Sequence, residues 1–329
     1  MTSRDGFEPA WWLKNPHMQT LWGKLARRKL PLFARVERWE TPDGDFVEVH
    51  RAEPPQERSA PRVVMLHGLE GTARSHYVGG VFAEARRRGW GTDLLVFRGC
   101  GDTLNRAKRF YHSGETGDLD FVVRRVTGEY PGRPIALVGV SLGGNVLLKW
   151  LGEQGADAPP EVRAAAGVSV PYDLSRGCRN IQRGFSAVYD RHFVRTLRAK
   201  VRKKRAAHPD LPDEAALGRV KTLWDFDDVV TAPVHGFADA EDYYAQSSSL
   251  QFLSRIRVPT LLLGAFDDPF LPPDVLDEVK AVARKNPALT TAFSAHGGHV
   301  GFVTGRVPFA AEYWAEGRVG RFLAEHVAR

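Results

Sequence analysis

Short apolar runs alternate with segments of helical spacing along most of the chain. The strand-like runs are residues 62–67, 92–97, 135–140 and 162–170. The segments between them, whose apolar side chains recur every three or four positions, are residues 77–88, 118–130 and 145–154. Uninterrupted apolar strands that alternate with helices are typical of a parallel sheet covered on both faces. The pattern therefore predicts an α/β fold with a doubly wound, mostly parallel sheet.

The alternation stops at Pro171 and resumes near residue 257. Residues 172–256 are polar, basic and mainly helical in spacing. The pattern returns with a strand at 258–263, a helix at 275–284, a strand at 289–293 and a helix at 309–328. We therefore predict a core formed by residues 1–171 and 257–329, and an inserted helical cap formed by residues 172–256.

The start of the chain predicts an opening β-hairpin. Residues 34–40 and 46–52 have strand character and flank the turn sequence Pro42-Asp43-Gly44. A polar loop follows at residues 54–60, and upstream Asn15-Pro16 is a helix N-cap followed by a first helical residue.

Composition limits the location and the cofactors that we expect. No stretch approaches the roughly 18 apolar residues of a transmembrane helix, and the N-terminus lacks the apolar segment of a secretory signal. Cys100 and Cys178 are too few for a disulfide framework or a four-ligand zinc site. We expect reduced thiols in a cytoplasmic protein, with no metal and no cofactor.

Positive charge is concentrated in one segment. The formal net charge is +7, but residues 176–205 hold eleven Lys or Arg and one acid, Asp190, so the rest of the chain sums to −3. Such a run is most often the solvated face of a helix, here in the cap. The alternative is weak contact with an anionic membrane. Because stacking aromatic residues and nucleic-acid motifs are absent, we expect no nucleic-acid partner.

The sequence Gly139-Val140-Ser141-Leu142-Gly143 is the sharpest motif. It joins a predicted strand to a predicted helix and matches the nucleophile elbow G-x-S-x-G. The serine of an elbow sits on a tight, strained turn, so its neighbours need to lack a Cβ atom. The turn exposes the serine Oγ at a helix N-terminus, and Ser141 is therefore the candidate nucleophile.

A serine nucleophile needs a base and an orienting acid, and both follow later strands. Asp268 is preferred as the acid because it lies four residues before Pro272, and Asp267 is the alternative. His299 is preferred over His296 as the base because Gly297-Gly298 allow it to approach the serine. Since each group follows its own strand, all three converge on one edge of the sheet.

An oxyanion hole for this serine would use two backbone N–H groups. One belongs to Leu142, directly after the candidate nucleophile. The other is expected in the loop His67-Gly68-Leu69-Glu70-Gly71 after the third strand, where Leu69 is our choice.

Seven segments together resemble a known family. They are residues 15–20, 67–71, 98–100, 111–116, 139–145, 267–270 and 296–302. The chain resembles an α/β-hydrolase, and more narrowly the YheT-like branch, which includes bacterial esterase-type proteins and animal relatives that act on acylglycerols and phospholipids. The resemblance implies a serine hydrolase acting on esters, with Ser141, Asp268 and His299 at the matching positions. The sequence gives no physical reason why residues 15–20 are part of this family pattern.

The expected reaction is cleavage of a small-molecule carboxylic ester, short-chain or acylglycerol-type, through an acyl-enzyme. An acyltransferase, thioesterase or amidase with the same triad, or a non-catalytic binding protein on this scaffold, are the alternatives. The remaining candidates have structural readings. Three histidines could line a pocket or support loops, namely His17, His76 and His112. Two arginines, Arg98 and Arg106, could bind a substrate anion or brace loops through Asp102 or Glu115. Cys100 is taken as structural.

Overall fold

The computed structural model describes residues 6–54 and 60–327, so the predicted polar loop at 54–60 lies almost entirely outside the described residues. Eight strands form one sheet in the order β1-β2-β4-β3-β5-β6-β7-β8. Their bounds are Arg35–Glu40, Phe46–Ala52, Arg62–Leu66, Gly91–Val96, Ile135–Val140, Val162–Val168, Thr260–Ala265 and Leu289–Ser294, for β1 to β8 in turn. β2 runs antiparallel to β1 and to β4, and the other neighbours are parallel. The predicted hairpin and mostly parallel sheet are confirmed.

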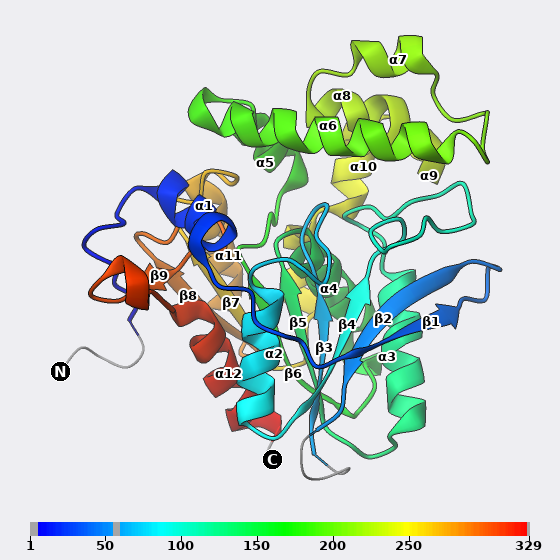
Figure 1. The fold of residues 1–329 in the computed structure, drawn as a ribbon. Helices are drawn as coiled ribbons and strands as arrows, with labels where there is room; N and C mark the ends of the chain where they lie inside the picture. Colours follow the sequence, from blue (N-terminus) through cyan, green and yellow to red (C-terminus); the bar gives the residue numbers. More distant parts are fainter. Residues whose placement is uncertain (1–5, 55–59, 328–329) are drawn as a thin grey trace.

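Helices cover both faces of this sheet (Figure 1). α2 and α12 pack against each other on one face, whereas α4 contacts α3 on the other. The helices of the core are α2 Val78–Arg87, α3 Gly117–Glu129, α4 Leu142–Gln154, α11 Pro273–Ala283 and α12 Trp314–Val327, with short 3₁₀ turns at η1 Gly155–Asp157 and η5 Pro308–Ala310. Strands β3 to β7 are buried along almost their whole length, which explains their uninterrupted apolar sequences.

Two predicted helix starts are wrong. The last helix begins at Trp314 instead of residue 309, because Glu312–Tyr313 form a two-residue strand, β10, that pairs with β9, Val303–Thr304. The helix predicted at 145–154 begins at Leu142, directly after the elbow serine. In both cases the chain makes contacts that local spacing does not encode.

Most of the segment between β6 and β7 forms helices above the C-terminal ends of the strands (Figure 1), and its last turn, η4, packs against α4 instead. The helices of this segment are α5 Leu174–Ile181, η2 Gly184–Ser186, α6 Ala187–Lys204, α7 Glu214–Arg219, α8 Leu223–Phe226, the π-helix η3 Asp227–Thr231, α9 Ala232–His235, α10 Ala240–Ser247 and η4 Ser249–Arg255. Val194, Leu197 and Val201 of α6 pack in a small apolar cluster of their own. Tyr172 and Leu253, near the two ends of the segment, are instead buried in the main core.

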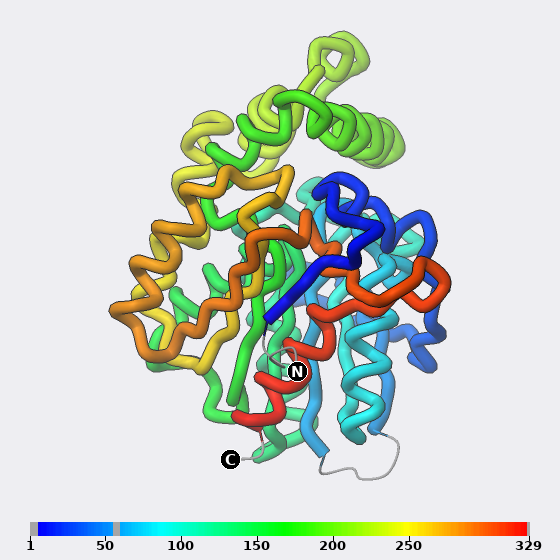
Figure 2. Tube along the Cα trace, turned by 90° about the vertical axis from the view of Figure 1, so that its left-hand side faces the viewer, coloured from blue at the N-terminus to red at the C-terminus, as the bar shows by residue number. Residues whose placement is uncertain are grey.

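Helix α1, Pro16–Ala26, contacts β9, and in Figure 2 the blue N-terminal segment lies beside the orange-red segment that carries β9. The Asn15 side chain accepts hydrogen bonds from the backbone N–H groups of His17 and Met18, at 2.9 and 3.1 Å, as an N-cap does. No helix in the described ranges 6–54 and 60–327 is long and apolar enough to cross a membrane.

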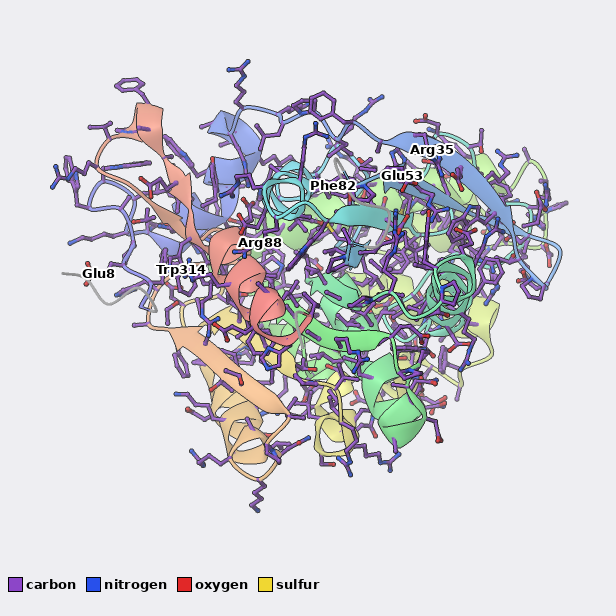
Figure 3. The ribbon with its side chains drawn as sticks, turned by 90° about the horizontal axis from the view of Figure 1, so that it is seen from below. Glu8, Arg35, Glu53, Phe82, Arg88 and Trp314 are labelled. Carbon is purple, nitrogen blue, oxygen red and sulfur yellow. The ribbon has the colours of Figure 1, made fainter. Side chains whose placement is uncertain are left out.

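The end of the molecule opposite the cap carries buried charges that are paired with one another. Arg62 and Arg51 donate to the Asp93 carboxylate from 2.7 Å. Glu53 accepts from Arg62 at 2.9 Å and lies 3.2 Å from Arg35, its neighbour at the edge of the sheet in Figure 3. These charges support the start of β3 and stand at the far end of the sheet from the elbow serine.

Candidate active site

Ser141 occupies the strained turn between β5 and α4. Its φ angle is +54°, a left-handed conformation that is costly for a residue with a side chain. A Cβ atom on Gly139 would lie 2.4 Å from the Gly143 carbonyl oxygen, and one on Gly143 would lie 2.5 Å from the His67 carbonyl oxygen. The elbow therefore requires glycine at both positions, and it directs the Ser141 side chain away from the sheet.

The structure brings three of the predicted side chains into one hydrogen-bonded line. His299 Nε2 lies 2.8 Å from Ser141 Oγ, and His299 Nδ1 lies 2.8 Å from Asp268 Oδ2. The second Asp268 oxygen accepts the Phe270 backbone N–H at 2.8 Å, and the Phe270 ring stacks on the imidazole with centroids 4.0 Å apart. Asp268 and His299 are both buried, so the acid can orient the imidazole and stabilise its protonated form.

Asp267 and His296, the two alternatives from the sequence, face each other instead. Asp267 Oδ2 lies 3.2 Å from His296 Nδ1, and its Oδ1 accepts the Gly298 N–H at 2.9 Å. Burial raises the pKa of Asp267, and the His296 side chain is 56% exposed. This pair braces the loop that carries His299.

The loop after β3 presents one free amide toward the site. The Gly68 N–H donates to the Tyr77 hydroxyl at 2.8 Å, and the Glu70 N–H donates to the Tyr111 hydroxyl at 2.7 Å. The Leu69 N–H between them has no protein acceptor in the described part of the chain, and neither has the Leu142 N–H at the start of α4. Both predicted oxyanion-hole amides are thus left available to a ligand.

A side chain from the cap is tied to the same loop. Lys200 of α6 donates to the Glu70 carboxylate, which also accepts the Tyr111 hydroxyl at 2.9 Å. Lys200 Nζ lies 3.2 Å from the Cys100 sulfur as well. Burial raises the pKa of Cys100 to about 11, so this thiol stays protonated and fits its structural interpretation.

Residues 15–20 support the loop that carries His299, a role that the sequence did not reveal. Thr20 Oγ1 accepts the His299 backbone N–H at 2.9 Å and donates to the Pro16 carbonyl at 2.7 Å. The fully buried Gln19 amide donates to the carbonyls of Leu13 and Val303 and accepts the Val303 N–H at 2.7 Å. The contacts join residues about 280 positions apart in sequence, so no local signal could have shown them.

The predicted arginines are engaged with acids other than those expected. Arg98 is buried and pairs with Asp118, Asp43 and Asp45, not with Asp102 or Glu115. Arg106 pairs with Glu40. The proposed partners were wrong because the opening hairpin, distant in sequence, folds against this loop.

The three candidate histidines lie in different surroundings. His112 lines the pocket described next. His17 packs on Phe185 of η2, whereas His76 is half-buried, and its buried Nδ1 has no hydrogen-bond partner in the described residues.

An apolar cavity of about 130 Å³ lies between the core and the cap. We call its two sides the core wall and the cap wall. The core wall includes Leu69, Tyr111, Ser141, Leu142, Phe270 and His299, and the cap wall includes Leu174, Ile181, Phe193, Leu197, Phe226 and Asp227. Ser141 therefore opens into a space suited to an apolar chain.

The basic segment faces two ways, because Lys200 and Lys204 turn toward the core whereas several of its arginines point outward. Arg191, Arg195 and Arg198 of α6 line a groove on the side of the helix away from the pocket, together with Arg202 and Lys221. Arg202 is paired with Glu214. The opposite side of α6 supplies Phe193 and Leu197 to the cavity.

Comparison with known proteins agrees with this architecture. Residues 61–306 match the family described as alpha/beta hydrolase fold. A solved esterase of Pyrococcus furiosus, Pf2001, superposes with a TM-score of 0.60 at 17% identity, covering 89% of this chain and 91% of that one. The chain therefore belongs to the α/β hydrolase family, in the branch that contains YheT.

Relatives by sequence define that branch. The chain is 40% identical to YheT of Escherichia coli (strain K12), over 99% of this chain and 95% of that protein. It is 28% identical to the phospholipase ABHD3 of Mus musculus, over 94% of this chain and 76% of that protein. It is 29% identical to a monoacylglycerol lipase of Saccharomyces cerevisiae, over 80% of this chain and 59% of that protein.

Proposed function

We propose that the protein hydrolyses carboxylic esters with Ser141 as nucleophile, His299 as general base and acid, and Asp268 as the orienting acid. The observation that carries the proposal is the line of two 2.8 Å contacts from Asp268 through His299 to Ser141, at the wall of an apolar cavity. The names of the relatives, which include a phospholipase and a monoacylglycerol lipase, support ester substrates.

Each step uses a group whose position is described above. His299 Nε2 takes the proton from Ser141 Oγ as the oxygen attacks the ester carbonyl carbon. The Leu69 and Leu142 amides hold the negative charge on the carbonyl oxygen. His299 then protonates the departing alcohol, and a water molecule, deprotonated by the same imidazole, cleaves the acyl-enzyme to release the acid and restore Ser141.

The first experiment measures the intact mass of the protein after incubation with a fluorophosphonate. We expect one adduct on the wild type and none on Ser141→Ala, because only an activated serine attacks the probe. A wild type that folds and remains unmodified would contradict the proposal and favour a non-catalytic binding role.

A panel of p-nitrophenyl esters from acetate to dodecanoate then defines the acyl chain that the pocket accepts. Adding an alcohol acceptor separates hydrolysis from acyl transfer, since transfer yields a new ester instead of free acid. This arm is pertinent because one relative, 27% identical, is named a medium-chain fatty acid ethyl ester synthase/esterase.

Two further expectations remain part of the proposal. The two unpaired thiols, Cys100 and Cys178, are in keeping with a cytoplasmic location. The outward arginines of α6 support weak contact with anionic membranes. Flotation with vesicles of phosphatidylglycerol, but not of phosphatidylcholine alone, tests that contact, and loss of flotation in an Arg195→Glu, Arg198→Glu variant would tie it to the groove.

A further inference from the structure

One wall of the cavity carries a carboxylate that the proposed reaction does not use. Asp227 lies on the cap wall, at the first position of the π-helix η3, which joins α8 to α9 above the sheet in Figure 1. Ser141 and His299 belong to the core wall of the same cavity. A substrate held by Ser141 would thus extend toward Asp227.

The hydrogen bonds of Asp227 come from neutral groups alone. Its Oδ1 accepts the Thr231 hydroxyl at 2.6 Å, and its Oδ2 accepts the Tyr244 hydroxyl at 2.7 Å. No Lys, Arg or His of the described chain lies within ion-pair distance of it. An ionised carboxylate has about four acceptor positions, so about two remain for another donor.

The surroundings of Asp227 make an unpaired charge costly. Leu174, Leu223 and Phe226 line the same cavity, and the negative charge of Asp190 also acts on Asp227. Burial raises the pKa of Asp227 to about 6, so at pH 8 the group still carries its charge. A charged group in an apolar cavity with no counter-charge is the arrangement that a complementary ligand stabilises.

The backbone at Asp227 also has an unusual hydrogen bond. The Ala232 N–H donates to the Asp227 carbonyl, five residues back, which is the hydrogen bond of a π-helix. Single π-turns are rare and occur frequently at functional sites. Here the turn places Asp227 and Thr231 on the cavity wall together.

We propose that Asp227 is a specificity subsite that selects esters bearing a cationic or hydroxyl group in the part of the molecule that reaches the cap wall. The subsite rests on the proposed function, because it selects among substrates of Ser141. The Asp227 carboxylate would accept a hydrogen bond from a hydroxyl group or pair with a cationic group, while the rest of the chain contacts the apolar wall.

The test compares matched ethyl esters at pH 8: hexanoate, 6-hydroxyhexanoate and 6-(trimethylammonio)hexanoate. A second series places the same three ends on the alcohol part, as the acetates of butanol, 1,4-butanediol and 4-(trimethylammonio)butanol. In one series at least, we expect the hydroxyl or cationic ester to have the higher kcat/KM. Asp227→Asn should reduce the ratio of kcat/KM for that ester to kcat/KM for the unsubstituted ester by about ten- to hundredfold, the range for one hydrogen bond to a charged group.

Asp227→Asn is suited to this purpose because one of the Thr231 and Tyr244 hydroxyls can go on donating to the amide oxygen while the other turns to accept from the amide nitrogen. Asp190→Asn is the matched control. Asp190 is another acid of the cap, and it is buried, but it accepts the Leu223 N–H and is absent from the cavity lining. If the hydroxyl and cationic esters hold no advantage in either series, or if Asp227→Asn and Asp190→Asn reduce the advantage equally, the subsite proposal is wrong.

Calorimetry with hexyltrimethylammonium and with hexanoate gives a readout that needs no turnover. We expect the cation alone to bind the wild type, and Asp227→Asn to weaken it by about tenfold or more. Absence of cation binding, together with no advantage for the hydroxyl esters and with normal fluorophosphonate labelling, would overturn the subsite and leave the hydrolase proposal intact. Cation binding without fluorophosphonate labelling would support a cation site at Asp227 and contradict the hydrolase proposal.

Discussion

Replacing Thr20 by valine tests whether residues 15–20 position the candidate base. Valine keeps the shape of threonine but lacks the hydroxyl, which accepts the His299 N–H at 2.9 Å and donates to the Pro16 carbonyl at 2.7 Å. A Cβ atom on Gly298 would lie 2.4 Å from the Pro16 oxygen and 2.8 Å from Thr20 Oγ1, so the two segments are in close contact. The packing leaves little space for a replacing water.

The magnitude follows from the groups left without a partner. An unpaired buried N–H costs about 1–3 kcal/mol, and His299 is buried. The loop can relieve that cost by shifting, which moves the imidazole away from Ser141 Oγ. Since about 1.4 kcal/mol in the transition state is a tenfold change in rate, we expect kcat to fall about tenfold, with at most about a hundredfold loss.

The assay is steady-state hydrolysis of the best p-nitrophenyl ester, with the unfolding midpoint measured in parallel. Thr20→Ser is the matched control, because it keeps the hydroxyl and loses only a methyl group. We expect KM to stay within about twofold in both variants, since Thr20 is not part of the cavity lining. Wild-type kcat in Thr20→Val, or an equal loss in Thr20→Ser, would refute the positioning role.

Three other predictions follow from the same structure. Asp268→Asn should lower kcat on the order of ten-thousandfold, whereas Asp267→Asn should lower kcat by about tenfold or less. Similar losses of kcat in the two variants would contradict the assignment of Asp268 as the triad acid. Lys200→Met should reduce the free energy of unfolding by about 3 kcal/mol and lower kcat by up to about tenfold, because it leaves the largely buried Glu70 carboxylate of the oxyanion loop without its cation. Adding Glu70→Gln should restore part of the stability in a double-mutant cycle, and additive effects would refute the coupling. Burial lowers the pKa of His76 from 6.5 to about 4, so between these two pH values the unfolded chain binds a proton that the folded chain does not. The free energy of unfolding of the wild type should therefore fall as the pH drops from 6.5 to about 4. In urea titrations His76→Phe should make this fall less steep by up to about 1.4 kcal/mol per pH unit, and parallel curves for the two proteins would rule the effect out.

Local information in the sequence was sufficient for the sheet and the elbow. The apolar runs mark buried parallel strands because such strands have no solvent-facing side. The turn at Ser141 needs glycine at 139 and 143 because any Cβ would collide with neighbouring backbone. The Gly139 contact lies within the elbow and each apolar run lies within one strand, so a single sequence displays both patterns, whereas the Gly143 contact comes from the end of β3.

The sequence left the choice between neighbouring acids to a preference. Asp267 and Asp268 are adjacent, and nothing in their spacing states which one faces His299. The turn after β7 directs their side chains differently, one toward Gly298 and His296 and the other toward His299. That direction depends on how the His299 loop packs against the turn.

What the sequence by itself determined is the set of chemical groups and the edge of the sheet where they gather, because the strands and the turns that follow them are encoded locally. Only the tertiary structure decided which groups support them. Thr20 reaches His299, Lys200 reaches Glu70, and Asp227 faces the cavity, through contacts between residues about 130 to 280 positions apart or across the cavity between cap and core. Such contacts depend on the packing of whole elements, which residue spacing does not specify.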